Sequence, residues 1–473
     1  MKKRIVRSTV AIFFSSGIAR FIGFISYIFL ARTLFPSDFG VMALAWLFVN
    51  TFTILFQGFR TSIIQSSEDK SALFTVIFIL EPLLATISIA TIFSTAPHIG
   101  SFFNSALLAE VLPLLSLVLI ITSFAAVPSL KLEKELLFEK RIIPSIVGEI
   151  IFPLVSIPLA LQGYGVLSLV YGTLASNISS LIAIWILAPW IPKLKFSNQI
   201  IKKVMDKGIR FASVGYLIFL LISVDKGIIG RLLGSEALGY YSIAFMIASI
   251  PVEGIAEVIG KVSLPALSQA KEDEKNLRRI YENFLQLIIM FILPFVVISV
   301  VLAWEITLYF YTAKWLPMVR ILQILLCFGL FRAIFVSCRD LLHAMGHPEH
   351  LIKLNIIQLG ILILLGVPVI QYYGVIGLSC LWTITMSIAA IYLSYYVKNL
   401  LKLKLIYIYR AYIVSAIISI ILVIFLKELG FITSIVSLIF VIFLGCFVNG
   451  VILVIQRPDL PRRYKSFLST IWK

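Results

Sequence analysis

Long apolar runs return along almost the whole length of this sequence. A helix crosses the bilayer core with roughly 20 mostly apolar residues, and a window of that length finds about fourteen candidate spans. They are centred near residues 20, 50, 85, 117, 153, 177, 221, 249, 292, 328, 363, 385, 418 and 444. Only 13% of the 473 residues are charged, too few to cover a chain of this length with water. The sequence therefore predicts an all-α polytopic membrane protein with about fourteen transmembrane helices.

The positive charges gather in every second loop between these spans, which places them on one side of the membrane. If the chain starts in the cytoplasm, the cytoplasmic segments hold Lys2, Lys3, Arg4 and Arg7, then the basic stretches 131–141, 193–210, 271–279 and 398–410, then the basic tail. The opposite loops, such as "APHIGSFFNS", "LQGYG", "QYYG" and "KELG", are short and nearly uncharged. Cytoplasmic loops of membrane proteins carry an excess of Lys and Arg, so both termini are predicted to be cytoplasmic. Arg20 interrupts the first apolar run, which favours an uncleaved first span over a signal peptide.

One turn occurs twice. Residues 31–40 read "ARTLFPSDFG" and residues 230–239 read "GRLLGSEALG", with an Arg eight residues before a Gly in each copy. Pro36 and the glycines suit a chain reversal, and Asp38 and Glu236 suit a cap of the following helix. Six predicted spans separate the copies, so the repeat indicates two parallel six-helix lobes and a C-terminal helix pair. Convergent turn chemistry is the alternative explanation.

The repeat sets the predicted domain organisation. The N-terminal six-helix lobe covers residues 1–190, and a basic cytoplasmic linker covers 191–210. The C-terminal six-helix lobe covers 211–397, and accessory helices 13 and 14 with a basic tail cover 398–473. Two similar bundles about one axis are the architecture of a transporter, because the space between them can open to either side.

Polar side chains recur on one face of several predicted spans. Ionisable groups inside a membrane are costly, so each is a candidate site. The stripes are Ser16, Arg20, Gly23 and Tyr27 in span 1, Asn50, Thr53, Gln57 and Arg60 in span 2, and Ser242, Ser249, Glu253 and Glu257 in span 8. Span 7 adds the adjacent Asp225 and Lys226, and span 10 carries Arg332 with Arg339 on the same face.

These charges predict a hydrated site for an anionic ligand. The four candidate binding cations are Arg20, Arg60, Lys226 and Arg332, and guanidinium groups match phosphate oxygens in paired hydrogen bonds. Asp225, Glu253 and Glu257 are candidates to pair with these cations or to bind a coupling H⁺ or Na⁺, while Ser16, Asn50, Thr53 and Gln57 would line the cavity. The alternative is that the charges are structural ion pairs or snorkel to an interface. Glu81, Glu110 and Glu149 each stand alone in their spans.

Other chemistries find little support. The four cysteines lie inside apolar runs, and the three histidines of "HAMGHPEH" (343–350) fit a connector better than a metal site. The sequence shows no nucleophile–base constellation and no phosphate-binding loop, so we expect neither an enzyme nor a resident cofactor or metal. The net charge of +17 is scattered between spans and forms no surface suited to nucleic acid.

Three stretches carry a family resemblance. Residues 225–251, "DKGIIGRLLGSEALGYYSIAFMIASIP", residues 322–333, "LQILLCFGLFRA", and the first copy, "ARTLFPSDFGVMALA", resemble bacterial polysaccharide-repeat flippases of the Wzx type. This family belongs to the multidrug/oligosaccharidyl-lipid/polysaccharide exporter superfamily, and the sequence is most similar to its colanic-acid-type branch. The resemblance is diffuse and extends over most of the chain, residues 5–400. Asp225, Lys226 and Arg332 match family-typical residues, whereas Arg20 and Arg60 match only a trend of basic residues in spans 1 and 2.

The resemblance implies a function that the residues alone do not specify. It implies alternating-access transfer of undecaprenyl-diphosphate-linked oligosaccharide to the periplasmic leaflet of a bacterial inner membrane. Besides this lipid-linked substrate, the implied partners are membrane lipids and the polymerase and chain-length regulator of the same pathway. A cation-coupled multidrug exporter, a membrane polysaccharide polymerase and a flippase for a peptidoglycan precursor are the alternatives. The charges deep in the spans are of both signs and include several cations, which disfavours the multidrug exporter. The outer loops are short, which disfavours the polymerase.

Overall fold

The computed structural model describes residues 17, 20–66, 70–135, 137–191, 198–403 and 405–458. In these ranges the chain is helical and contains no strand. Contacts divide it into unit 1, Met1–Gly239, and unit 2, Tyr240–Lys473. This boundary falls inside a long helix. It reflects the packing of the chain and not the sequence repeat, so it does not test the lobe limits at residues 190 and 211, which stay a prediction.

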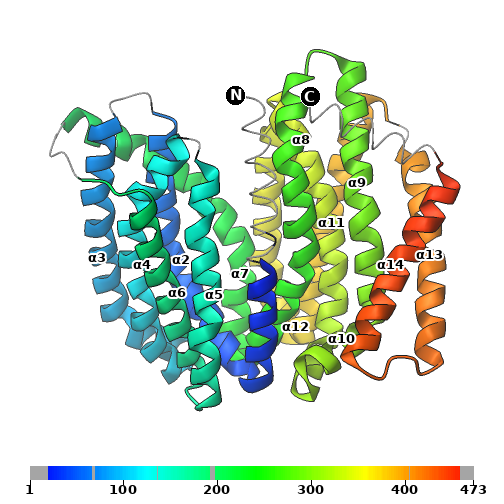
Figure 1. The fold of residues 1–473 in the computed structure, drawn as a ribbon, viewed down its shortest axis with the longest axis horizontal. Helices are drawn as coiled ribbons and strands as arrows, with labels where there is room; N and C mark the ends of the chain where they lie inside the picture. The colour runs from blue at the N-terminus through cyan, green and yellow to red at the C-terminus, as the bar shows by residue number, and fades with distance from the viewer. Residues whose placement is uncertain are drawn as a thin grey trace. The chain divides into compact units, whose positions relative to one another are not determined.

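Unit 1 begins with a helix over residues 20–33. Five helices follow, and the first part of a sixth completes the unit. Their bounds are α2 (Pro36–Ile64), α3 (Lys70–Phe102), α4 (Ala106–Lys134), α5 (Phe138–Leu161), α6 (Val166–Leu187) and α7 (Asn198–Pro251). Figure 1 shows α2 to α6 as a bundle of steep, neighbouring helices. The predicted linker 191–210 is therefore helical from Asn198 onward and continuous with α7, while residues 192–197 lie outside the described part.

Unit 2 contains the remaining helices. They are the π-helix η1 (Val252–Ala256), α8 (Glu257–Gln269), α9 (Glu274–Val301), α10 (Ala303–Ile306), the π-helix η2 (Thr307–Tyr311), the 3₁₀-helix η3 (Ala313–Met318), α11 (Val319–Met345), α12 (Glu349–Leu401), α13 (Leu405–Glu428) and α14 (Ile435–Gln456). The last two form the predicted accessory pair and pack on α9 around a core that includes Ile298, Val423 and Val441. The basic tail from residue 459 lies outside the described residues.

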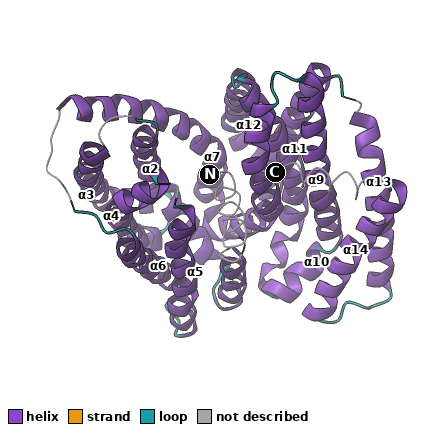
Figure 2. Ribbon diagram, turned by 45° about the horizontal axis from the view of Figure 1, so that its top comes forward, coloured by secondary structure: helices purple, strands orange, loops and turns teal. Residues whose placement is uncertain are grey.

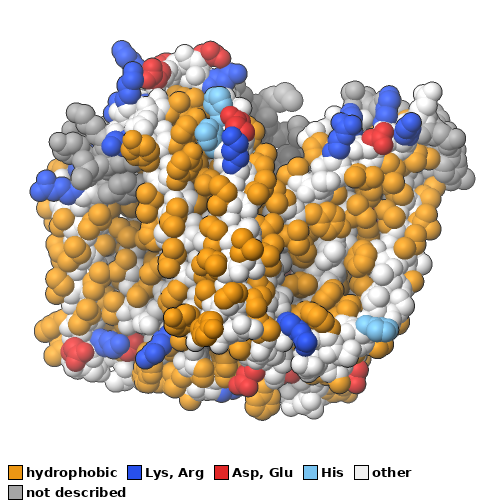
Figure 3. Space-filling model, turned by 180° about the vertical axis from the view of Figure 1, so that it is seen from behind, with side chains coloured by type: hydrophobic (Ala, Val, Ile, Leu, Met, Phe, Trp, Pro, Cys, Tyr) orange, Lys and Arg blue, Asp and Glu red, His pale blue; other side chains and the backbone are white. Residues whose placement is uncertain are grey.

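Helix length and side-chain exposure agree with a membrane protein. Eleven of the described helices are long and apolar enough to cross a membrane. Large apolar side chains remain exposed on their flanks, for example Ile186 at 74% and Phe443 at 70%. Figure 3 shows apolar side chains along the helix flanks and charged ones gathered toward the helix ends. Because lipid solvates such flanks, the prediction of an all-α polytopic membrane protein is confirmed.

Two of the eleven spanning helices are long enough to cross a membrane twice, so eleven helices are compatible with about fourteen predicted crossings. The span Gln199–Gln269 contains Gly234 with φ of +83°, and the span Glu349–Leu401 contains Gly374 with φ of +62°. Residues with a side chain rarely adopt such angles, so each glycine permits a break between two membrane-crossing segments. The helix over residues 20–33 coincides with the second half of the first predicted span, whose first half lies mostly outside the described residues.

The repeated turn interrupts the helical path at equivalent places. In the first copy Phe35 is extended, with φ −88° and ψ 156°, and α2 begins at Pro36. In the second copy the break is at Gly234, which is 199 positions after Phe35. The predicted capping by Asp38 is confirmed, since its Oδ2 accepts a hydrogen bond from the Phe35 N–H at 2.8 Å. Capping by Glu236 stays a prediction.

The two copies also touch each other within unit 1. A Cβ built at Gly40 would overlap the carbonyl oxygen of Ser235, and one built at Gly239 would overlap that of Pro36. Pro36 and Ser235 are themselves equivalent positions of the repeat, so the contact is reciprocal. Such a pattern is expected when two copies of one motif meet across a local two-fold axis.

Candidate functional site

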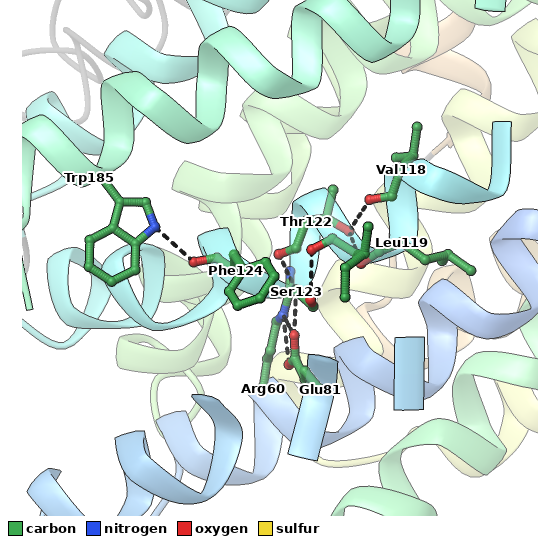
Figure 4. A network of polar contacts seen from close by, with 9 residues as sticks. Arg60, Glu81, Val118, Leu119, Thr122, Ser123, Phe124 and Trp185 are labelled. Atoms are coloured by element: carbon green, nitrogen blue, oxygen red, sulfur yellow. Dashed lines mark hydrogen bonds and ion pairs between the residues drawn. The ribbon is translucent and has the colours of Figure 1, made fainter. Parts of the chain in front are cut away.

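An arginine–glutamate pair lies inside unit 1 (Figure 4). Arg60 of α2 donates from Nη2 to Glu81 Oε2 of α3 at 2.7 Å and from Nε to Oε1 at 3.0 Å. Its Nη2 also donates to the carbonyl oxygen of Thr122 on α4 at 3.0 Å. The Glu81 side chain is fully buried, whereas that of Arg60 is 28% exposed. The pair therefore ties three helices together, and Glu81 does not stand alone as the sequence suggested.

The rest of the polar stripe on α2 is more open than the buried Glu81. The side chain of Gln57 is exposed, and those of Asn50 and Thr53 are half-buried. The Thr53 hydroxyl donates to the carbonyl oxygen of Val49 within its own helix at 3.1 Å. Arg60 thus lies at the end of a partly exposed polar face. Its guanidinium is held in place by Glu81 and by the carbonyl oxygen of Thr122. A role for these residues in binding cargo stays a prediction.

The stripe in the first helix turns toward protein in its second half. A Cβ at Gly23 would lie 3.0 Å from Glu149 Oε2 of α5. The Tyr27 ring stacks on Phe152, also on α5, with centroids 5.8 Å apart. Gly23 and Tyr27 therefore face α5. The Arg20 side chain is exposed, and Ser16 lies outside the described residues, so their predicted roles are untested.

Asp225 and Lys226 lie on α7 in unit 1 and differ in exposure. Asp225 is fully buried, and its Oδ1 accepts a hydrogen bond from the backbone N–H of Lys226 at 2.7 Å. The Lys226 side chain is half-buried. The structure does not test their predicted roles as a coupling acid and a binding cation.

Unit 2 holds a larger charged network between α8 and α11. Arg339 of α11 donates from Nη1 to Glu257 Oε1 at 3.2 Å and from Nη2 to Oε2 at 3.1 Å. The same guanidinium donates from Nε and Nη2 to Asp340 Oδ1, both at 3.0 Å. A Cβ at Gly260 would collide with the other Asp340 oxygen, so this glycine makes room for the carboxylate. Glu257 therefore pairs with Arg339, which the sequence analysis did not select as a site residue.

Arg332 lies two turns before Arg339 on the same helix. It is half-buried, and its Nη1 donates to the Ser249 hydroxyl at a long 3.4 Å. Glu253, Glu257 and Arg339 all contribute to the electrostatic environment of Arg332. Glu253 belongs to η1, the π-helical turn after Pro251, and its side chain is exposed. Such π-helical turns are common at functional sites because they change the direction of side chains.

The two units place opposite charges on comparable helices. In unit 1 the helix after the repeated turn carries a cation, Arg60, whose acidic partner is on the next helix. In unit 2 the equivalent helix carries the acids Glu253 and Glu257, and the cations Arg332 and Arg339 are on α11. Sequence reasoning missed Glu81, Arg339 and Asp340 as members of these networks. The one available signal was the spacing of Arg332 and Arg339, seven residues apart on one face.

The structure offers no metal site in the part of the chain it describes. No group of three or more His, Cys, Asp or Glu residues there has a metal-binding arrangement. The connector histidines have other contacts: His347 Nδ1 lies 3.1 Å from Glu349 Oε1, and the His350 ring lies against the Tyr396 ring at a tilt of 40°, with centroids 4.3 Å apart. All four cysteines are free thiols.

Comparison with known proteins gives these charged helices a context. Residues 29–320 match the model of a family described as polysaccharide biosynthesis protein, which is more than half of the chain. The chain belongs to this polysaccharide biosynthesis family. It is 25% identical over 414 residues to an uncharacterized membrane protein in the cps region of Klebsiella pneumoniae, covering 84% of this chain and 82% of that protein. It is 24% identical over 410 residues to the lipopolysaccharide biosynthesis protein WzxC of Escherichia coli K12, covering 83% and 80%.

Solved structures show the same fold in transporters. The lipid II flippase MurJ, in an inward closed conformation, superposes with a TM-score of 0.79 at 17% identity, covering 96% of this chain and 99% of its own. A multidrug resistance transporter of the MATE family, in an inward-facing conformation, superposes with a TM-score of 0.64 at 18% identity, covering 80% and 94%. At these identities the likeness establishes the fold. This member of the polysaccharide biosynthesis family is therefore a multi-pass membrane protein with a transporter fold.

Proposed function

We propose that this protein is a flippase that moves oligosaccharide repeat units, linked to undecaprenyl diphosphate, across a membrane for the synthesis of a surface polysaccharide. The family match and the named relatives in polysaccharide biosynthesis support the pathway. The fold shared with a lipid II flippase supports the type of reaction, which is transport and not covalent catalysis.

The observation that carries the proposal is a partly exposed arginine in the membrane-spanning part of each unit. Arg60 keeps 28% of its side chain exposed although Glu81 and the Thr122 carbonyl hold its guanidinium. Arg332 is half-buried and donates to the Ser249 hydroxyl, and the charges of Glu253, Glu257 and Arg339 act on its guanidinium. An arginine fixed by neighbours loses little conformational freedom on binding, and its planar fork suits a diphosphate.

The orientation follows from the cationic segments. Because positive charges gather in alternate loops, we place both termini in the cytoplasm and the protein in the bacterial inner membrane. The cargo would then move from the cytoplasmic to the periplasmic leaflet. Binding that favours one state over the other would shift the equilibrium of an alternating-access cycle. Coupling to H⁺ or Na⁺ through Asp225, Glu253 or Glu257, and work beside a polymerase and a chain-length regulator, belong to this proposal.

The test is an export assay in cells whose own gene is replaced by variants. Arg332→Gln removes the guanidinium, and Arg60→Lys keeps a positive charge near Glu81 but removes the planar fork. Both should leave lipid-linked oligosaccharide on the cytoplasmic leaflet, where a membrane-impermeant glycosidase added to spheroplasts cannot reach it. Arg320→Gln is the matched control, because Arg320 is an exposed cation on the same helix as Arg332.

The outcomes separate the alternatives. Wild-type export by both variants, at wild-type protein levels, would refute the binding role of the two arginines. If loss of the whole protein changed drug resistance while the polysaccharide stayed normal, the multidrug exporter would be correct. If lipid-linked units crossed the membrane but were not polymerised, the polymerase would be correct. Dissipating the proton and sodium gradients separately would then identify the coupling ion.

A further inference from the structure

The first turns of α7 form an amphipathic helix at one rim of unit 1. Residues on one side, Ile200, Ile201, Val204 and Met205, pack on a core that includes Phe59 and Ile63 of α2, Leu73 and Phe74 of α3 and Val127 and Leu130 of α4. Figure 2 shows this part of α7 lying across the ends of α2 and α3. Since α2 ends at Ile64 and α3 begins at Lys70, the helix lies at the level where these spans leave the membrane.

Close backbone contacts hold this segment against α2. The Phe59 ring occupies the space that a Cβ at Gly208 would need, and a Cβ at Gly58 would overlap the carbonyl oxygen of Gly208. The Ser62 hydroxyl also donates to the carbonyl oxygen of Val204 at 3.4 Å. These contacts fix which side of the helix faces unit 1 and therefore which side faces away from it.

The opposite side of the same turns is basic. Its exposed residues are Lys202, Lys203, Asp206, Lys207 and Arg210, so four cations accompany one acid. Helical spacing gathers all five on the side away from Val204 and Gly208. Ile209, 49% exposed, lies at the edge between the basic and apolar sides, where it can enter the acyl region of a bilayer. We call the four cations, Lys202, Lys203, Lys207 and Arg210, the basic face.

We propose that the basic face binds the phosphate headgroups of anionic membrane lipids at the cytoplasmic surface. An amphipathic helix with Lys and Arg on its polar side, held at the rim of a membrane domain, has the geometry for the headgroup layer. Each cation near an anionic surface adds to the attraction, so four on one side favour a negative lipid over a neutral one. The cytoplasmic location rests on the proposed orientation, but the binding does not rest on transport.

The test measures lipid binding to the purified full-length protein in a neutral detergent. Native mass spectrometry would follow titration with phosphatidylglycerol or with phosphatidylcholine. The variant K202Q/K203Q/K207Q/R210Q should bind phosphatidylglycerol about tenfold more weakly or worse than wild type, with phosphatidylcholine binding unchanged. Added salt should reduce the wild-type preference toward that of the variant.

A matched control removes four exposed cations elsewhere. K271Q/K275Q/R279Q/K353Q loses the same charge from unit 2, where Glu272, Asp273 and Glu274 interrupt the cations, and it should keep the wild-type preference. The triple variant K202R/K203R/K207R keeps the charges and should also bind normally. If the basic-face variant failed to fold, the salt dependence and this triple variant would still test the proposal.

Three results would overturn it. The first is wild-type affinity of the basic-face variant for phosphatidylglycerol. The second is an equal loss for both lipids. The third is loss of undecaprenyl diphosphate binding with phosphatidylglycerol binding intact, which would make the basic face a landing site for cargo. The first two results do not bear on export, and the third would still agree with a flippase, so failure here is distinct from failure of the flippase assignment.

Discussion

Gly40 packs directly against the backbone carbonyl of Ser235, although the two residues are far apart in the sequence. Gly239 packs in the same way against the carbonyl of Pro36. These four residues are two pairs of equivalent positions, so the repeated motif contacts its own copy. Only a residue without a Cβ permits this approach, which explains why both copies end in glycine.

Alanine at either glycine should destabilise the protein. Gly40→Ala places a methyl group against the Ser235 carbonyl, and Gly239→Ala places one against the Pro36 carbonyl. Overpacking of this kind costs about 1–3 kcal/mol. Thermal unfolding of the purified protein in detergent would show the loss as a lower midpoint. Gly227→Ala, on α7, is the control, because a Cβ there meets nothing within 4 Å. Equal midpoints for Gly40→Ala and Gly227→Ala would contradict the close contact.

The ion pair of Arg60 and Glu81 predicts a marked non-additivity. Arg60→Met leaves a fully buried carboxylate without its partner, and breaking a buried pair this way costs about 3–5 kcal/mol. The partial exposure of Arg60 places the expected cost at the lower end of that range. The double variant Arg60→Met/Glu81→Met should recover most of the loss, because no buried charge is left. A double variant whose loss equals the sum of the two single losses would argue against coupling.

Arg339 should not tolerate lysine. Its guanidinium holds both oxygens of Glu257 and one oxygen of Asp340 at once, and an ammonium group has no planar fork to do so. We expect Arg339→Lys to lower the unfolding free energy by about 1–3 kcal/mol, the cost of leaving a buried acceptor unsatisfied. Arg279→Lys, at an exposed position on α9, is the control. Unchanged stability of Arg339→Lys would show that the fork does not matter.

The accessory pair depends on two polar contacts with different expected effects. Lys427 of α13 lies 2.9 Å from Glu305 Oε1 on α10, and Asn449 of α14 donates to the buried Ser415 hydroxyl of α13 at 3.2 Å. Asn449→Ala removes a hydrogen bond between membrane helices, worth about 0.6 kcal/mol on average. Lys427→Ala leaves the buried carboxylate of Glu305 without its partner and should cost more.

Limited proteolysis of the connection between α13 and α14 would compare these two variants. Faster cleavage of Lys427→Ala than of Asn449→Ala is the expected order, since the lysine anchors the pair to α10. Cleavage in the reverse order would mean that Asn449, and not the ion pair, holds the accessory helices in place. Lys402→Ala, at the exposed residue after α12, is a suitable control.

Several features of this protein are determined locally and could be predicted from its sequence. The apolar runs require helices, because a backbone in lipid must satisfy its own hydrogen bonds. The break near Phe35 and its equivalent at Gly234 follow from turn chemistry, and so does the Asp38 cap. The amphipathic character of residues 198–210 also follows from spacing alone.

The pairing of the intramembrane charges was decided by tertiary structure. Periodicity placed Arg60 on a polar face but gave no indication of Glu81, which reaches it from another helix. It likewise linked Arg339 to Arg332 and not to Glu257, its actual ion-pair partner. Helical phase reports which residues share a face, whereas the rotation and depth of a neighbouring helix depend on how both pack. Those packing terms are sums over many contacts, and no local pattern in the chain encodes them.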